Sequence, residues 1–155
     1  MGRLKIMFTV ALLGIAFLVN AQEELIYRNG QLYSVNTAEA ENSYTTYHEN
    51  GKKSAVYSLE NGILNGKAQF FYDNGANQEM GSYKDGEKHG DWVRWNESGA
   101  KIGEISYYLG AKDGQWTLWD AEGNKCYEMH YDRGEKVGHW KMWDAEGNLI
   151  SEKEY

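Results

Sequence analysis

The sequence repeats itself every 24 residues, and this period restricts the possible fold more than any other feature of the chain. Glycine keeps the step in three columns, which are Gly51, Gly75, Gly99, Gly123 and Gly147; Gly62, Gly86, Gly110 and Gly134; and Gly66, Gly90, Gly114 and Gly138. Thirteen of the 18 glycines fall in these columns, which excludes an accident of composition. A period of this length is typical of proteins in which each repeat is one small supersecondary unit.

Aromatic residues keep the same period. All six tryptophans occur as Trp-x-x-Trp pairs near the start of successive units, namely Trp92 and Trp95, Trp116 and Trp119, and Trp140 and Trp143. A tyrosine column runs through Tyr83, Tyr107, Tyr131 and Tyr155. Units therefore begin at residues 44, 68, 92 and 116, and a truncated unit covers 140–155. The repeat region is predicted to span 44–155.

Within each unit the local pattern predicts a β-hairpin. Aromatic runs are bounded by segments such as Asp120-Ala121-Glu122-Gly123, whose glycine favours a tight turn with positive φ. In the second strand, Ile105 and Tyr107 alternate with Glu104 and Ser106, so one face is expected to be buried and the other wet. A lone hairpin is marginal in water, so each unit must pack on the next. We predict an all-β fold, an elongated single antiparallel sheet of stacked 24-residue hairpins with the glycine columns as structural turn residues.

The tryptophan pairs leave two interpretations open. Trp92 and Trp95 are three positions apart, so a regular strand would place them on opposite faces. Either a bulge rotates one ring, or each face carries its own aromatic ladder. The six tryptophans are also the residues for which we predict a role in binding a partner.

The amino terminus has the features of a secretory signal peptide. Arg3 and Lys5 precede an apolar run from Ile6 to Val19, which is shorter than the roughly 20 residues that a membrane-spanning helix needs. Val19-Asn20-Ala21 supplies small residues where signal peptidase cleaves. We expect residues 1–21 to be removed and the mature protein to be exported to the periplasm, the cell surface or the medium of a bacterium, with no membrane span. Residues 22–43 are expected to form a degenerate cap hairpin and a polar lead-in.

Charge narrows the choice of partner. The chain carries 16 Lys and Arg against 23 Asp and Glu, a net charge of −7. Removing Arg3 and Lys5 with the signal peptide leaves 14 basic against 23 acidic residues, a net charge of −9. Nucleic acids and anionic lipid surfaces recruit basic patches, so neither is an expected partner.

Motifs for catalysis, metals or cofactors are not found in the sequence. His48, His89, His130 and His139 occupy unrelated positions of the repeat and show no ligand spacing. Cys126 is the only cysteine, so it cannot form an internal disulfide, and no base or oxyanion hole can be named for it. The glycine-rich segments lack the Lys-Ser/Thr of a phosphate loop. We expect no enzymatic activity, no cofactor and no metal.

Two segments carry a family resemblance. Residues 83–92, Tyr-Lys-Asp-Gly-Glu-Lys-His-Gly-Asp-Trp, and their copy at 131–140, Tyr-Asp-Arg-Gly-Glu-Lys-Val-Gly-His-Trp, resemble MORN repeats, and more narrowly the bacterial MORN variant. The resemblance covers residues 44–155. It implies a sheet of hairpins used as a scaffold, without catalytic residues. Bacterial members of this kind often carry the label of a toxin-antitoxin antitoxin component, whereas an ordinary antitoxin acts in the cytoplasm.

Two function hypotheses follow from these features. The first is an exported protein-binding scaffold with an antitoxin-like or immunity-like role, whose partner is another protein. The alternative is a glycan-binding or choline-binding cell-wall module, because short repeats rich in Trp, Tyr and Gly also describe such modules. Those modules use aromatic residues that form open cages, whereas Trp-x-x-Trp spacing fits packing between units.

Export is tested by the amino terminus of the mature protein. We expect the chain to begin at Gln22 when it is isolated from the cell envelope or the medium, because peptidase should cleave after Ala21. Intact-mass spectrometry of the fractionated protein measures this directly. A cytosolic protein that retains Met1 or Gly2 would contradict the prediction.

Overall fold

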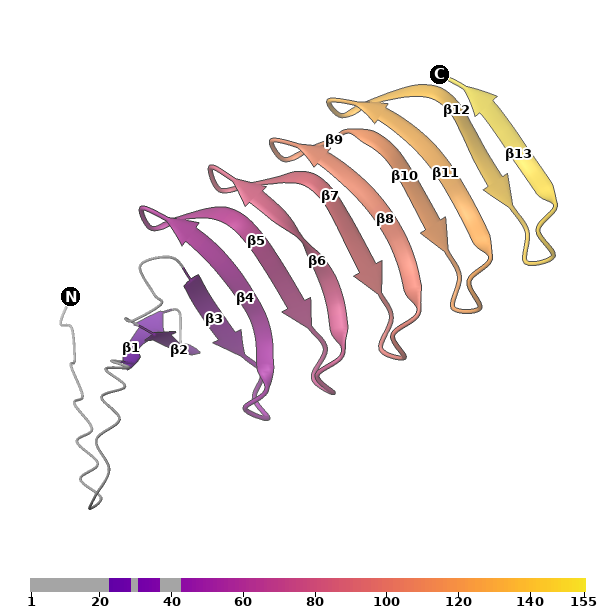
Figure 1. Cartoon of the computed structure of the whole chain (residues 1–155). Coiled ribbons are helices and arrows are strands. Elements are labelled where there is room, and N and C mark those ends of the chain that lie inside the picture. The colour runs from indigo at the N-terminus through magenta and orange to yellow at the C-terminus, as the bar shows by residue number, and fades with distance from the viewer. Residues whose placement is uncertain (1–22, 29–30, 37–42) are drawn as a thin grey trace, which may run out of the picture.

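The repeat region folds as a series of β-hairpins (Figure 1). The structure is a computed structural model that describes residues 23–28, 31–36 and 43–155, with side chains from residue 43 onward. No helix long and apolar enough to cross a membrane occurs in these residues. The strands are β1 (Glu23–Arg28), β2 (Gln31–Asn36), β3 (Ser43–Tyr47), β4 (Lys53–Glu60), β5 (Ile63–Phe71), β6 (Asn77–Lys84), β7 (Glu87–Trp95), β8 (Lys101–Tyr108), β9 (Ala111–Lys112), β10 (Gly114–Trp119), β11 (Lys125–Asp132), β12 (Glu135–Trp143) and β13 (Leu149–Glu154).

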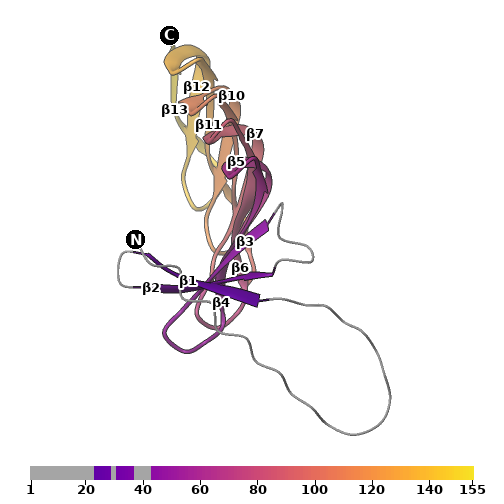
Figure 2. The same ribbon diagram turned by 90° about the vertical axis from the view of Figure 1, so that its left-hand side faces the viewer.

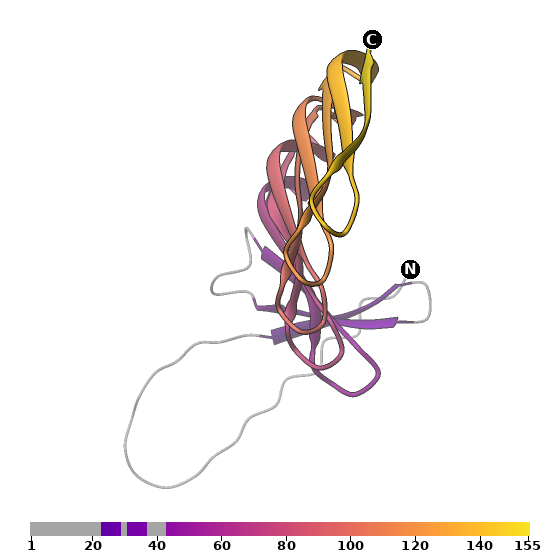
Figure 3. The same ribbon diagram turned by 90° about the vertical axis from the view of Figure 1, so that its right-hand side faces the viewer.

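In the described residues, the strands form one antiparallel sheet. Their order in the sheet is their order in the chain, with the short strand β9 paired beside β8. The sheet is elongated across the strands (Figure 1), and views from its two sides show that it is thin and twisted (Figures 2 and 3). The predicted all-β fold of stacked hairpins is confirmed.

The segment before the repeats contains one strand pair. β1 pairs with β2 over its whole length, from Glu23 opposite Asn36 to Arg28 opposite Gln31. β2 joins the repeats through the pairing of Ser34 with Thr45. The predicted signal peptide, residues 1–21, lies outside the described residues, and so do residues 37–42 of the predicted lead-in.

Two kinds of turn alternate along the sheet, and the longer kind uses side chains as caps. In the turn at 120–124, the amide of Asp120 donates to the carbonyl of Asn124 at 3.0 Å, and Gly123 has a φ of 92°. The Asp120 carboxylate accepts the amides of Glu122 and Asn124 at 3.1 and 2.8 Å. Hydrogen bonds from Asn124 hold the pKa of Asp120 below its ordinary value. This turn recurs at 144–148 with Asp144 and Asn148 in the same roles.

The shorter turns have two residues, at 61–62, 85–86, 109–110 and 133–134. Both residues have positive φ in each of them, as type I′ hairpin turns require. Asn61 and Asp85 suit the first position because they tolerate the left-handed region. Leu109 and Arg133 occupy it in the other two turns, with φ of 46°. An L-residue without a short polar side chain is strained there by about 1–2 kcal/mol.

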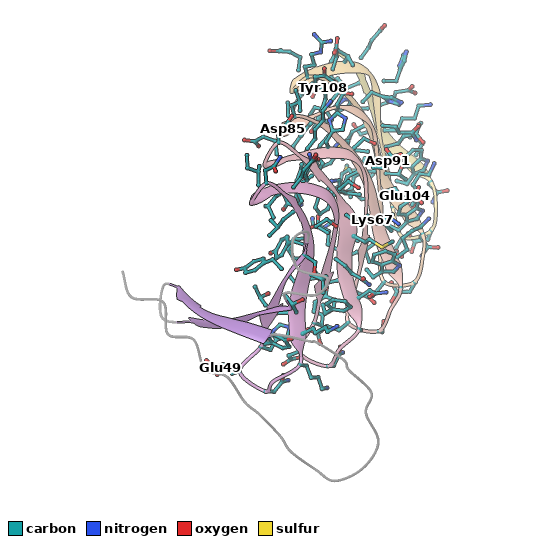
Figure 4. The ribbon with its side chains drawn as sticks, turned by 60° about the vertical axis from the view of Figure 1, so that its left-hand side comes forward. Glu49, Lys67, Asp85, Asp91, Glu104 and Tyr108 are labelled. Carbon is teal, nitrogen blue, oxygen red and sulfur yellow. The ribbon has the colours of Figure 1, made fainter. Side chains whose placement is uncertain are left out.

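The third glycine column lies inside strands, beside the short turns and not within a turn. Met80 pairs with Val93 and Ser82 pairs with His89, so one residue of β6 faces three of β7, among them Gly90. Gly90 has a φ of 73°, and the other members of the column, Gly66, Gly114 and Gly138, also have positive φ. Such a bulge bends the strand. Figure 4 shows this bend, in which the strands curve toward one side near the short turns.

The curvature gives the sheet two different faces. Lys67, Asp91 and Glu104 project from the outer side of the bend in Figure 4, and we call this the outer face. The opposite side is the concave face. Residues paired across neighbouring strands share a face, so the register assigns the other strand residues to one face or the other.

Backbone bonds between units recur at the repeat period. The amide of Gly86 donates to the carbonyl of Leu64, and the bonds from Gly110 to Lys88 and from Gly134 to Lys112 are its copies, at 2.7–2.8 Å. Each of these turn glycines is therefore bonded to the strand that follows the preceding short turn. Each unit depends on its neighbours for bonds that it cannot make alone.

The strain at Leu109 can be relieved by one substitution. We expect Leu109→Asn to raise the free energy of unfolding by about 0.5–1 kcal/mol, since Asn tolerates positive φ where Leu does not. Urea unfolding of the two proteins measures the gain. Ile63→Asn is the control, because Ile63 is an exposed strand residue beside an equivalent turn, 53% exposed against 44% for Leu109. An equal gain in both variants would show that loss of exposed apolar surface, and not the backbone, is responsible.

Candidate protein-binding surface

An unbroken ladder of aromatic rings runs along the concave face. Tyrosines of one unit alternate with the first tryptophan of the next, so each ring contacts rings on both sides. The successive contacts, with their ring-centroid distances, are Tyr44–Tyr57 (5.4 Å), Tyr57–Tyr83 (6.3 Å), Tyr83–Trp92 (5.3 Å), Trp92–Tyr107 (6.4 Å), Tyr107–Trp116 (5.3 Å), Trp116–Tyr131 (5.4 Å), Tyr131–Trp140 (5.0 Å) and Trp140–Tyr155 (5.0 Å). Tilted and edge-on arrangements predominate, as ring quadrupoles favour.

The ladder is also the hydrophobic core. Trp92 at its centre is 0% exposed and packs with buried Ala68, Ile105 and Trp116. Gly81 lies directly under the Trp92 ring, where a Cβ atom would overlap three ring carbons. Only glycine therefore lets Trp92 reach this depth. In a single sheet these inward rings take the place of a second layer.

Indole hydrogen bonds differ along the ladder. Trp116 Nε1 donates to the carbonyl of Ser106 at 2.8 Å, and Trp140 Nε1 donates to the carbonyl of His130 at 3.0 Å. Trp92 Nε1 is buried without a hydrogen-bond partner in the described structure. Trp92 is therefore held by packing, whereas the two later tryptophans are also fixed by a bond to the preceding strand.

A column of lysines covers the ladder at the same period. Lys88 Nζ lies 3.8 Å from the ring centre of Trp92 and 5.4 Å from that of Tyr107. Lys112 repeats the arrangement over Trp116 and Tyr131 at 4.8 and 4.9 Å, and Lys136 over Trp140 and Tyr155 at 4.4 and 4.9 Å. Each ammonium group thus lies between the tryptophan and the tyrosine of the following unit, in cation–π contact with both.

The concave face carries positive charge although the whole chain is acidic. Arg94 pairs with Glu79 across the sheet, and Lys153 pairs with Trp140, which adds two cations to the lysine column. Among the described strand residues on this face, five are cationic and one, Glu79, is a carboxylate. Glu79 lies 3.0 Å from Lys88 Nζ and 3.6 Å from Arg94 Nε. Positive charge is therefore concentrated on this face, while the net charge of the chain is −7.

Tyr83 and Tyr107 on this face keep their protons at neutral pH. Burial raises the pKa of Tyr83 to about 12, with further contributions from Tyr57 and Glu79. Burial also raises the pKa of Tyr107. Their hydroxyl groups therefore remain hydrogen-bond donors.

The second tryptophan of each pair lies on the outer face. Trp92, Val93 and Arg94 pair regularly with Ile105, Glu104 and Gly103, and the extra residue before the Trp95–Lys101 pair belongs to β8. β7 itself is regular here, so Trp92 and Trp95 point to opposite faces. The sequence left open a bulge that rotates one ring or a separate aromatic column on each face. The structure has a separate column on each face.

The outer tryptophans are half-buried, and two of them, Trp119 and Trp143, are covered by lysines. Lys101 Nζ lies 4.5 Å from the ring centre of Trp119 and donates to Glu104 at 2.6 Å. Lys125 repeats this arrangement with Trp143 at 5.3 Å and Glu128 at 2.8 Å. A shallow hollow of about 280 Å³ beside Trp119 is lined by Ala100, Lys101 and the turn residues Ala121, Glu122 and Gly123. The lysines here are neutralised by carboxylates, unlike most of those on the concave face.

The six predicted binding tryptophans therefore form two sets of three, and the structure brings only Trp92, Trp116 and Trp140 into one ladder. The lysine column was missed in the sequence, although the signal was present. Lys88, Lys112 and Lys136 each precede a ladder tryptophan by four residues. Leu64 holds the equivalent position in the earlier unit.

His48, His89 and His139 lie in different units and contact different partners. His48 Nε2 is 2.9 Å from the carbonyl of Phe71, His89 packs on Tyr108, and His139 is 3.2 Å from Glu152. Cys126 is half-buried and free. No group of three or more His, Cys, Asp or Glu side chains that could hold a metal occurs in the described residues.

Comparison with known families agrees with this geometry. The family model described as MORN repeat variant matches residues 64–85, 112–133 and 136–155. These repeats belong to the MORN repeat variant family. Each matched segment begins at the column of Leu64, Lys112 and Lys136, so the MORN match has the same 24-residue phase as the ladder. No curated protein matches the chain at a significant level.

The two tryptophan sets of the MORN repeats should differ in their contribution to stability. We expect Trp92→Ala to lower the free energy of unfolding by about 3–5 kcal/mol, because it removes a fully buried core ring. Trp119→Ala should cost less than half of that, since its ring is half-buried on the outer face. Chemical denaturation of both variants and the parent compares the losses. Equal losses would mean that the outer tryptophans contribute as much to folding as the ladder does.

Proposed function

We propose that the chain is an exported, non-catalytic scaffold that binds another protein on the concave face of its sheet. The observation that carries the proposal is the separation of charge on a repeat sheet of the MORN type. The concave face combines aromatic rings with five cations and one carboxylate, whereas the outer face and turns hold most of the acidic residues. Tyrosine, tryptophan and arginine side chains are enriched where proteins bind one another, and complementary charge steers the partner to such a face.

The repeating geometry argues against catalysis. An active site needs different groups that converge on one point, whereas each side chain of the concave face is repeated along the sheet. The histidines and Cys126 lie at separate positions and do not form a nucleophile and base.

The glycan or choline alternative is less well supported by the geometry. A choline cage needs open aromatic walls around a vacant centre. In these repeats Lys88, Lys112 and Lys136 already occupy the cation positions above the rings. Stacking of a sugar on Trp119 would have to displace Lys101, which is bound to Glu104.

Export determines where the partner would be met. The predicted signal peptide places the partner in the periplasm, on the cell surface or in the medium. An antitoxin-like or immunity-like role is the case in which that partner is a toxin secreted by the same cell or by a competitor. Binding on a wide face, without chemistry, would suffice to block such a partner.

Site-specific photo-crosslinking in cells that produce the full chain tests the proposal. A photoreactive amino acid is placed at Arg94 on the concave face or at Glu104 on the outer face, which are close in the sheet and equally exposed, at 54% and 52%. We expect an adduct with one extracytoplasmic protein from position 94 and none from position 104. Protease should destroy the adduct and glycan hydrolases should not. An adduct confined to position 104, or one sensitive to glycan hydrolases, would refute the proposal.

A further inference from the structure

The lysine column is a set of positive charges at regular spacing. Lys88, Lys112 and Lys136 pair with Tyr83, Tyr107 and Tyr131, so the same position recurs in successive units. Adjacent copies are two strands apart. Strands in a sheet are separated by about 4.8 Å, so successive ammonium groups are displaced by about 9.6 Å along the sheet. A ligand that follows this column must present negative charge at the same interval.

Only some peptide conformations have that interval. A polyproline II segment advances about 3.1 Å per residue and completes a turn in three residues, so every third side chain points the same way at steps of about 9.3 Å. In an extended strand, side chains on one face recur about every 6.7 Å. Two turns of an α-helix advance about 10.8 Å, and the mismatch grows with each unit. The polyproline II step is closest to that of the sheet.

The tyrosine rings between the lysines also favour a ligand in the polyproline II conformation. Half-buried Tyr83 and Tyr107 alternate with the ammonium groups along the ladder. Polyproline II segments dock on aromatic-lined surfaces, because proline rings pack on the aromatic rings and the stiff ligand loses little entropy. Their carbonyl groups are unpaired within the segment and can accept bonds from tyrosine hydroxyls.

The charges on the two faces indicate that the ligand is acidic and that it binds the concave face. Lys112 and Lys136 have no carboxylate in contact among the described ion pairs, whereas Lys101 and Lys125 on the outer face each bind a glutamate. An acidic ligand would therefore gain two uncompensated cations on the concave face. The outer face would repel it through Asp91, Glu104 and Glu128.

We propose that the concave ladder binds an acidic, proline-rich segment of the partner in the polyproline II conformation, which runs across the strands with a carboxylate at every third residue. The proposal rests on the proposed function and names the chemistry of its partner. Two carboxylates would reach Lys112 and Lys136, and the residues between them would lie on the tyrosines.

Synthetic peptides of defined spacing test this with the full mature chain. The probe is a fluorescent peptide of repeated Glu-Pro-Pro, and the comparison peptides are Glu-Pro-Pro-Pro with the same number of glutamates, Gln-Pro-Pro, and a helical peptide with one glutamate every seven residues. Fluorescence anisotropy measures each affinity. We expect Glu-Pro-Pro to bind at least about tenfold more tightly than the others and to weaken as salt is added. Equal affinity for the two acidic proline peptides, or tighter binding of the helix, would overturn the proposal.

Two double variants locate the binding face. Lys112→Gln with Lys136→Gln removes two charges and four cation–π contacts from the concave face, and Lys101→Gln with Lys125→Gln removes two charges and two cation–π contacts from the outer face. We expect the first to weaken Glu-Pro-Pro binding about tenfold, since an exposed ion pair accounts for up to about fivefold each. The second should bind as the parent does, or tighter. Equal weakening by both would show that binding follows net charge alone, and the proposal fails.

The outcome for the peptide is separate from that for the scaffold. If no peptide binds while photo-crosslinking from position 94 still captures a protein, the proposed function stands and the polyproline II ligand is wrong. If neither occurs, both fail. Unfolding curves of the two lysine variants ensure that a lost affinity is not a lost fold.

Discussion

The contact of each ladder tryptophan with the tyrosines on either side of it is the interaction on which the rest of the structure depends. A single sheet has no second layer to cover it, so its apolar side chains must bury one another. Trp92 achieves complete burial only because Gly81 beneath it has no side chain and the rings of Tyr83 and Tyr107 flank it. The glycine bulges, by bending the strands, give this self-covering face its concave shape.

The same face therefore supplies both the core and the proposed binding surface. Most proteins separate these tasks between an interior and an exterior. Here the inner side of the Trp116 ring stabilises the sheet, and its outer side lies beneath Lys112, which is exposed to solvent. A partner would then contact side chains that folding has already fixed, so little further order would be lost on binding.

The 24-residue period was enough to predict the sheet, because glycine and aromatic columns record turns and packing directly. It did not decide how Trp92 and Trp95 divide between faces, since that depends on which strand of a pair carries the extra residue, here β8. Nor did it show that Gly90 and its copies lie in strand bulges, because positive φ serves turns and bulges alike. The lysine column was visible as a repeat, but its meaning required the pairing of Lys88 with Tyr83, which places it over the rings.

The order of the strands has a mechanical consequence. Hydrogen bonds between antiparallel strands run perpendicular to them, and in this sheet that direction is its long axis (Figure 1). Tension applied between the two ends would load the strand pairs in series, so they would peel apart one after another at low force and not shear together. Each released hairpin would lengthen the molecule while the remaining units kept their shape. A protein built in this way would yield gradually when its two ends are pulled apart.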